Sequence, residues 1–162
     1  MANGTRMYQH ILIPTDGSEL SKMALQEGIA LAKALDARVT AITVTMPFRV
    51  FIARTSAAAI TPEQYEEDMG TLASRHLDEA KNIAAAASVP CTLVHVQHEH
   101  PYRAIIDTAL SQGCDAIHMA SHGRGGMSAI VLGSETLKVL THSAVPVIVC
   151  RRQRPAGLST IR

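Results

Sequence analysis

Tryptophan is absent from this chain of 162 residues, and the only aromatic residues are three tyrosines and two phenylalanines. Base stacking on aromatic side chains, which many single-strand nucleic-acid binders use, is therefore not expected. An excess of charge of one sign is also lacking, because 15 Lys and Arg balance 14 Asp and Glu to a net charge of +1. This balance argues against a strongly basic nucleic-acid-binding protein.

Cysteine is scarce and widely spaced, since Cys91, Cys114 and Cys150 form no CxxC pair. Such a set indicates neither a disulfide framework nor a zinc site, and it fits a reducing compartment. Long apolar runs are missing too: the run at residues 11–13 is far shorter than the roughly 20 residues that cross a bilayer. The N-terminus lacks the pattern of a signal peptide. We therefore expect a cytoplasmic protein without a membrane segment.

The chain has enough apolar residues, 47%, for one packed core. We predict a single domain over residues 1–152 and a flexible C-terminal tail over 153–162. Short apolar segments predict strands at residues 10–14, 39–45, 91–97, 115–120 and 145–150. Helical patterns follow at about 18–35, 61–87, 101–112 and 133–142, while 46–60 has no clear period.

This alternation predicts a three-layer α/β/α fold, with a mainly parallel five-stranded sheet between two layers of helices. In such sheets the ligand lies beyond the carboxyl ends of the strands, where the strand order reverses. The residues that follow each strand are therefore the first candidates for a functional site.

A glycine-rich segment, ASHGRGGMS at residues 120–128, follows the fourth predicted strand, and GSET at 133–136 opens the last helix. Glycines let backbone N–H groups approach an anion, and a helix N-terminus adds oriented donors. Ser134 would cap its helix and donate its hydroxyl to a phosphate, with a second hydroxyl from Thr136 and a charge from Arg124. The pattern favours a phosphate site, although ordinary turns and an N-cap would account for the same residues.

Generic nucleotide motifs do not decide the question. The P-loop pattern is absent, and Ser128 stands where a G-x-G-x-x-G would need its third glycine. Asp16, after the first strand, would repel a phosphate but can accept hydrogen bonds from a ribose or adenine, hold a metal ion, or only cap its turn. We expect Asp16 beside the glycine-rich segment if the first and fourth strands are neighbours.

Two segments resemble the universal stress protein family: HILIPTDGSELS at 10–21, and MASHGRGGMSAIVLGSETLKVLTHSAVPVIVCR at 119–151. Nucleotide-binding members carry Gly, two residues, Gly, nine residues, Gly and then Ser or Thr. Gly123, Gly133 and Ser134 match this pattern, whereas Ala120 replaces the first glycine and adds a methyl group near the expected phosphate path. The resemblance covers about residues 8–151.

The resemblance implies a flavodoxin- or Rossmann-like domain of the adenine nucleotide alpha hydrolase type. It also implies ATP binding, with Mg²⁺ as a companion ion, and a homodimer paired through the edge strand at residues 145–150. The positions that it implies for the nucleotide are Pro14, Thr15 and Asp16 at the adenosine, Val44 at the adenine, Met119 and Ala120 at the end of the fourth strand, and Gly123, Arg124, Gly133, Ser134, Glu135 and Thr136 around the phosphates. Glu135 is expected to face an anion only through its backbone.

The predicted function is that of an ATP-binding stress-response regulator that acts through a nucleotide-dependent state or partner binding. No arrangement of general base, arginine finger and positioned water is evident, so efficient ATP hydrolysis is not predicted. Two alternatives stay open: a slow ATP hydrolase or self-phosphorylating protein, and a dimeric interaction module that no longer binds nucleotide, which Ala120 would favour.

Histidines offer two further hypotheses. His95, His98 and His100 are crowded together, but we interpret them as polar residues around a loop rather than as metal ligands. Ser121 and His122 are adjacent in sequence, and adjacent residues of an extended chain face opposite sides. A Ser–His catalytic pair is therefore not expected there.

Overall fold

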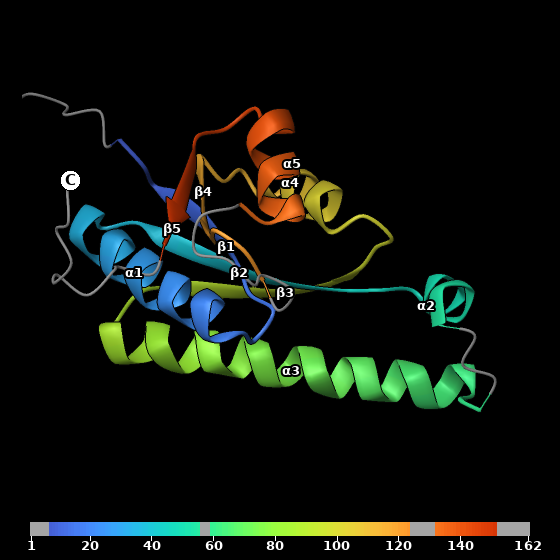
Figure 1. Ribbon diagram of the computed structural model, residues 1–162. Helices are drawn as coiled ribbons and strands as arrows, with labels where there is room; N and C mark the ends of the chain where they lie inside the picture. Colours follow the sequence, from blue (N-terminus) through green and yellow to red (C-terminus); the bar gives the residue numbers. More distant parts are fainter. Residues whose placement is uncertain (1–6, 56–58, 124–131, 152–162) are drawn as a thin grey trace, which may run out of the picture.

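A computed structural model describes residues 7–55, 59–123 and 132–151 of the chain (Figure 1). The predicted tail at 153–162 lies outside the described residues, as does the segment 124–131 with Arg124. The elements follow in the order β1 (His10–Pro14), α1 (Glu19–Leu35), β2 (Arg38–Thr45), α2 (Phe48–Thr55), α3 (Pro62–Ala87), β3 (Cys91–Gln97), α4 (Pro101–Ser111), β4 (Ala116–Ala120), α5 (Ser134–His142) and β5 (Val147–Cys150).

The five strands form one sheet in the order β3-β2-β1-β4-β5, and every neighbouring pair is parallel. The chain builds outward from β1 to β3 and then returns to place β4 on the other side of β1. This is the Rossmann order rather than the flavodoxin order, and its reversal lies between β1 and β4. The predicted α/β fold is confirmed, and the first and fourth strands are neighbours, which is the condition under which Asp16 was expected beside the glycine-rich segment.

Helices cover both faces of the sheet, with α1 and α3 on one side and α4 and α5 on the other (Figure 1). The packing of the central strand β1 on both of its faces explains why its sequence is continuously apolar. Ile11 and Ile13 pack into the α1/α3 layer and Leu12 into the α4/α5 layer, and all three are fully buried. Strands covered on both faces are expected to read in this way.

The long helices begin at the residues whose side chains predict a cap. Ser18 accepts a hydrogen bond from the backbone N–H of Ser21 at the start of α1, and Thr61 accepts one from Gln64 at the start of α3. Each cap satisfies a donor that the first helical turn leaves without an intrahelical partner.

One helix was not predicted. Residues 48–55 form α2, which lies beyond the end of the sheet beside the first half of α3 (Figure 1). The rings of Phe48 and Phe51 lie 5.5 and 4.7 Å from the ring of Tyr65 between their centroids, and the Tyr65 hydroxyl donates to the Met46 carbonyl at 2.7 Å. Its packing partner, Tyr65, therefore belongs to another helix, which the local pattern of 46–60 cannot show.

Candidate functional site

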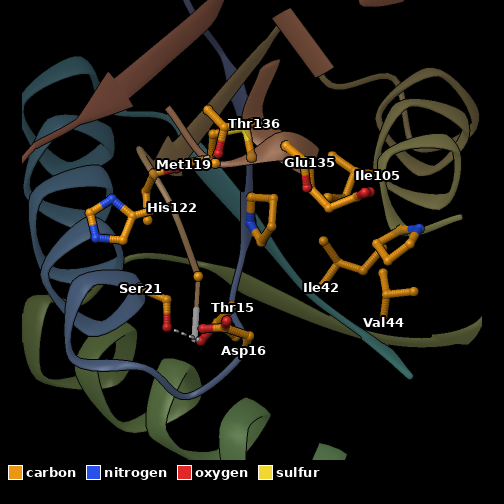
Figure 2. Close-up of a pocket in the computed structure, with 16 residues that line it drawn as sticks. Thr15, Asp16, Ser21, Ile42, Val44, Ile105, Met119, His122, Glu135 and Thr136 are labelled. Atoms are coloured by element: carbon orange, nitrogen blue, oxygen red, sulfur yellow. Dashed lines mark hydrogen bonds between the residues drawn. The ribbon is translucent and has the colours of Figure 1, made fainter. Parts of the chain in front are cut away.

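A cavity of about 420 Å³ opens where the strand order reverses, at the carboxyl ends of β1, β2 and β4 (Figure 2). Its volume lies in the usual range of small-molecule sites, and its place in the fold is the one that parallel α/β sheets use for ligands. This cavity is therefore the candidate functional site.

The structure brings together all of the predicted nucleotide-binding residues that it describes. Those that line the cavity are Pro14, Thr15, Asp16, Val44, Met119, Ala120, Gly123, Gly133, Ser134, Glu135 and Thr136. Arg124, the remaining predicted residue, lies outside the described part of the chain.

Sequence reasoning missed several lining residues, namely Ser21, Ile42, Pro101, Ile105 and His122. Ile42 had a signal, because it lies two positions before Val44 on the same strand and so faces the same side. Pro101 and Ile105 are one helical turn apart on α4, but only the sheet order shows that this helix borders the cavity.

One wall of the cavity is apolar. Ile42 and Val44 of β2 lie beside Ile105 of α4, as Figure 2 shows. A flat ring system could pack on these side chains and lose its contact with water there, which is favourable in proportion to the apolar area buried.

The turn between β1 and α1 forms the opposite wall and is held by its own hydrogen bonds. The Asp16 carboxylate accepts one from the backbone N–H of Ser18 at 3.0 Å, so it does fix the turn. The Thr15 hydroxyl lies 3.3 Å from that of Ser21. Gly17 has φ +74°, and a Cβ there would overlap the ring of His76 on α3. This position therefore requires glycine.

The end of β4 approaches the same turn closely. A Cβ on Gly123 would overlap the Asp16 carboxylate, so the predicted place of Asp16 beside the glycine-rich segment is confirmed. The backbone N–H of Gly133 donates to the Ser121 carbonyl at 2.8 Å, which joins the two ends of the loop between β4 and α5. Ser121 is itself fixed, because its N–H donates to the Cys150 carbonyl at 2.8 Å.

The N-terminus of α5 differs from the prediction at two residues. Gly133, not Ser134, is the N-cap, and it makes no side-chain cap hydrogen bond. Ser134 is instead the first residue of the helix, and its side chain is exposed. The Thr136 hydroxyl is buried and donates to the Ala120 carbonyl at 3.0 Å, so its proton is not available to a phosphate. Thr136 thus ties α5 to the end of β4.

Glu135 points its carboxylate toward α4. One oxygen accepts a hydrogen bond from the backbone N–H of Tyr102 at 2.9 Å, and the other lies 2.8 Å from the ammonium of Lys138. The side chain of Glu135 therefore links the two helices that border the cavity.

The histidines correct one prediction. The Ser121 hydroxyl lies 3.2 Å from Nδ1 of His122, so the expectation that these neighbours do not meet is wrong. The chain leaves the strand geometry directly after Ala120, and the strict alternation of sides ends there. Within the described residues, no three His, Cys, Asp or Glu side chains are placed to hold a metal ion.

Comparison with known proteins identifies the family of this chain. The model of the universal stress protein family matches residues 7–151. The universal stress protein MJ0531 of Methanocaldococcus jannaschii is 31% identical over 156 residues, which cover 94% of this chain and 87% of the relative. In the structure itself, the described residues contain no helix that is both long and apolar enough to cross a membrane.

Solved structures share the fold. The structure of MJ0577, also from Methanocaldococcus jannaschii, superposes with a TM-score of 0.74 at 26% identity and covers 91% of this chain and 99% of its own. A universal stress protein solved in complex with cAMP has a TM-score of 0.68 at 21% identity, with 90% and 98% of the two chains covered.

Proposed function

This chain belongs to the universal stress protein family, and on that premise we propose that its cavity binds adenine nucleotides, ATP with Mg²⁺ among them. The protein would act as a stress-response regulator whose nucleotide-bound state governs its partners. The observation that carries the proposal is the N-terminus of α5, whose N-cap Gly133 makes no side-chain hydrogen bond, at a cavity that has an apolar wall.

Three helices begin at this cavity, and their N-termini are not equivalent. Ser18 caps α1 through its side chain, and Glu135 accepts the hydrogen bond of Tyr102 at the start of α4. At α5 the N-cap is Gly133, which has no side chain to offer. Backbone donors of a first helical turn bind anions readily when no side chain takes them. A phosphate therefore fits best at α5.

The rest of the cavity suits an adenosine. The apolar wall of Ile42, Val44 and Ile105 offers a surface for a flat base, and the Asp16 carboxylate is at hand for ribose hydroxyl groups. Each carboxylate oxygen can accept more than one hydrogen bond, so a ribose hydroxyl could share Asp16 with the N–H of Ser18. The relative that was solved with cAMP supports a ligand of this class.

The phosphate position can be tested at Gly133. A Cβ there would lie 3.0 Å from Cα of His122, so Gly133→Val places bulk against the backbone at the proposed phosphate site. We expect this variant to bind ATP at least about tenfold more weakly, which corresponds to roughly 1.4 kcal/mol, and to keep most of its affinity for adenosine. Isothermal titration calorimetry with both ligands measures the two effects.

Gly70→Val is the matched control, because a Cβ at Gly70 on α3 meets no atom within 4 Å. It should bind ATP as the parent does. Equal binding of ATP by Gly133→Val and the parent would reject the phosphate position. A parent protein that binds no adenine nucleotide would favour the interaction module without nucleotide.

We also propose that two copies of the chain pair through β5. This strand lies at one edge of the sheet, and Val147, Ile148 and Val149 are only partly buried. An exposed apolar edge offers unpaired backbone groups to another chain, and pairing with a second copy would cover it.

A further inference from the structure

Glu135 contributes both its backbone and its side chain to the rim of the cavity. As the second residue of α5 it contributes a backbone N–H to the proposed phosphate site. Its carboxylate, 36% exposed, reaches across to α4 and lies beside Ile105 in Figure 2. The same residue therefore brings a donor and a negative charge to one end of the cavity.

The first turn of α4 explains why the carboxylate lies there. Pro101 has no N–H, and the N–H of Arg103 donates to the His100 carbonyl at 3.0 Å. The N–H of Tyr102 stands between them, and Glu135 accepts its hydrogen bond at 2.9 Å. His100, the N-cap, provides no side-chain hydrogen bond of its own. An acidic side chain at a helix N-terminus is also favoured by the helix dipole. Glu135 thus fills the place at α4 that an anionic ligand group would otherwise take.

Two acidic side chains line the part of the cavity that the structure describes. Among the described residues that line it, Asp16 and Glu135 are acidic, and none is Lys or Arg. Lys138 pairs with Glu135 but does not line the cavity. The N-terminus of α5 can receive one phosphate, whereas every further phosphate adds negative charge close to the Glu135 carboxylate.

We propose that Glu135 is a specificity-determining residue, whose negative charge makes the site favour an adenine nucleotide with one phosphate over one with three. The inference rests on the proposed function, because it takes a phosphate at the start of α5 as given. It concerns the ratio of the two affinities and not whether nucleotides bind.

Glu135→Gln tests the proposal, because glutamine keeps the length of the side chain and an oxygen that can accept from Tyr102 but removes the charge. Dissociation constants for ATP and AMP are measured by calorimetry at fixed ionic strength in the presence of EDTA, so that no Mg²⁺ neutralises the phosphates. We expect the constant for ATP to fall about fivefold and that for AMP to change less than about twofold.

Lys138→Gln tests the opposite direction. It leaves the Glu135 carboxylate without its ion pair, so we expect ATP to bind about threefold more weakly and AMP to change less. Glu63→Gln is the control, since Glu63 is likewise the second residue of its helix, α3, but is exposed and does not line the cavity. Its ratio of ATP to AMP affinity should equal that of the parent.

The outcomes distinguish a failure of the proposed role of Glu135 from a failure of the proposed nucleotide binding. If both nucleotides bind the parent and Glu135→Gln shifts them by the same factor, or shifts neither, Glu135 acts only as a structural link between helices and the inference is wrong. If the parent binds neither nucleotide, the proposed function itself fails. Thermal unfolding of each variant checks that the comparison is made on folded protein.

Discussion

His118 lies in the centre of β4, and its ring packs against Gly28 of α1. Burial lowers the pKa of His118 below its ordinary value of 6.5, because the charged ring would lose its hydration there. Burial lowers the pKa of His10 on β1 as well, with Arg38 acting in the same direction. Both rings are therefore neutral in the folded protein at pH 7.

The lowered pKa values of His118 and His10 determine how stability changes with pH. The unfolded chain protonates these rings near pH 6.5, whereas the folded chain does so only at a lower pH. Unfolding thus takes up protons below pH 6.5, and the free energy of unfolding falls as the pH drops through the window between the two pKa values. We expect urea unfolding to show lower stability at pH 5 than at pH 7.5.

His118→Gln should flatten this dependence, even if it lowers stability at every pH. His142→Gln on α5 is the control, since this histidine is exposed. An unchanged slope in His118→Gln would assign the pH dependence to other groups.

At the same scale, the sequence predicts the glycines of the site better than its hydroxyl groups. A Cβ at Gly123 would overlap the Asp16 carboxylate and one at Gly133 would lie 3.0 Å from Cα of His122, so the surroundings of both motif positions favour glycine. The partner of the Thr136 hydroxyl, the Ala120 carbonyl, comes from another element, so no local pattern could show it. The contact of Ser121 with His122 depends on where β4 ends, which is a property of the sheet.

Among the helices, α3 contains an interior glycine that lowers its stability. Gly70 lies in its interior, and a Cβ there would meet no atom within 4 Å. Glycine costs a helix interior roughly 0.5–1 kcal/mol relative to alanine, chiefly through the entropy of the unfolded chain. Gly70→Ala should therefore raise the free energy of unfolding by about that amount in a urea titration.

Gly17→Ala provides the contrast for this prediction. Its positive φ and the nearby ring of His76 make any side chain unfavourable, so this variant should lose stability. A decrease in stability for Gly70→Ala would mean that the first half of α3 is not a regular helix in solution.

Most element boundaries follow from caps, proline and strand composition. Thr61 and Pro62 predict the start of α3, and Pro101 predicts that of α4. The helix α2 was missed because its aromatic residues pack on Tyr65 of another element. Residues 48–55 therefore lack the periodic spacing of buried residues from which a helix can be predicted.

For the whole molecule, the edge at β5 determines the expected assembly. Val149→Lys would place a charge on the proposed interface. We expect the parent to sediment as a dimer and this variant as a monomer. Thr92→Lys is the control, since Thr92 is exposed on β3 at the opposite edge of the sheet, and it should remain dimeric. A monomeric parent, or a Val149→Lys variant that sediments as the dimer does, would reject the interface.

The layered α/β architecture could be predicted at this scale because alternating strands and helices leave few ways to bury both faces of a sheet. The strand order is a different matter. It depends on where β4 pairs after the long excursion through α2, α3 and β3, and no local signal fixes that choice. Once the order is known, the cavity and its lining follow.

The fluorescence of Tyr102 offers a way to follow ligand binding at the cavity without an added label. The backbone N–H of Tyr102 donates a hydrogen bond to the Glu135 carboxylate. The Lys138 ammonium lies 5.4 Å and the Arg103 guanidinium 5.7 Å from the centre of the Tyr102 ring. Because the chain contains no tryptophan, tyrosine emission is not masked by a stronger fluorophore. Any rearrangement of these cations as a ligand enters should therefore register in the intrinsic ultraviolet emission of the native protein.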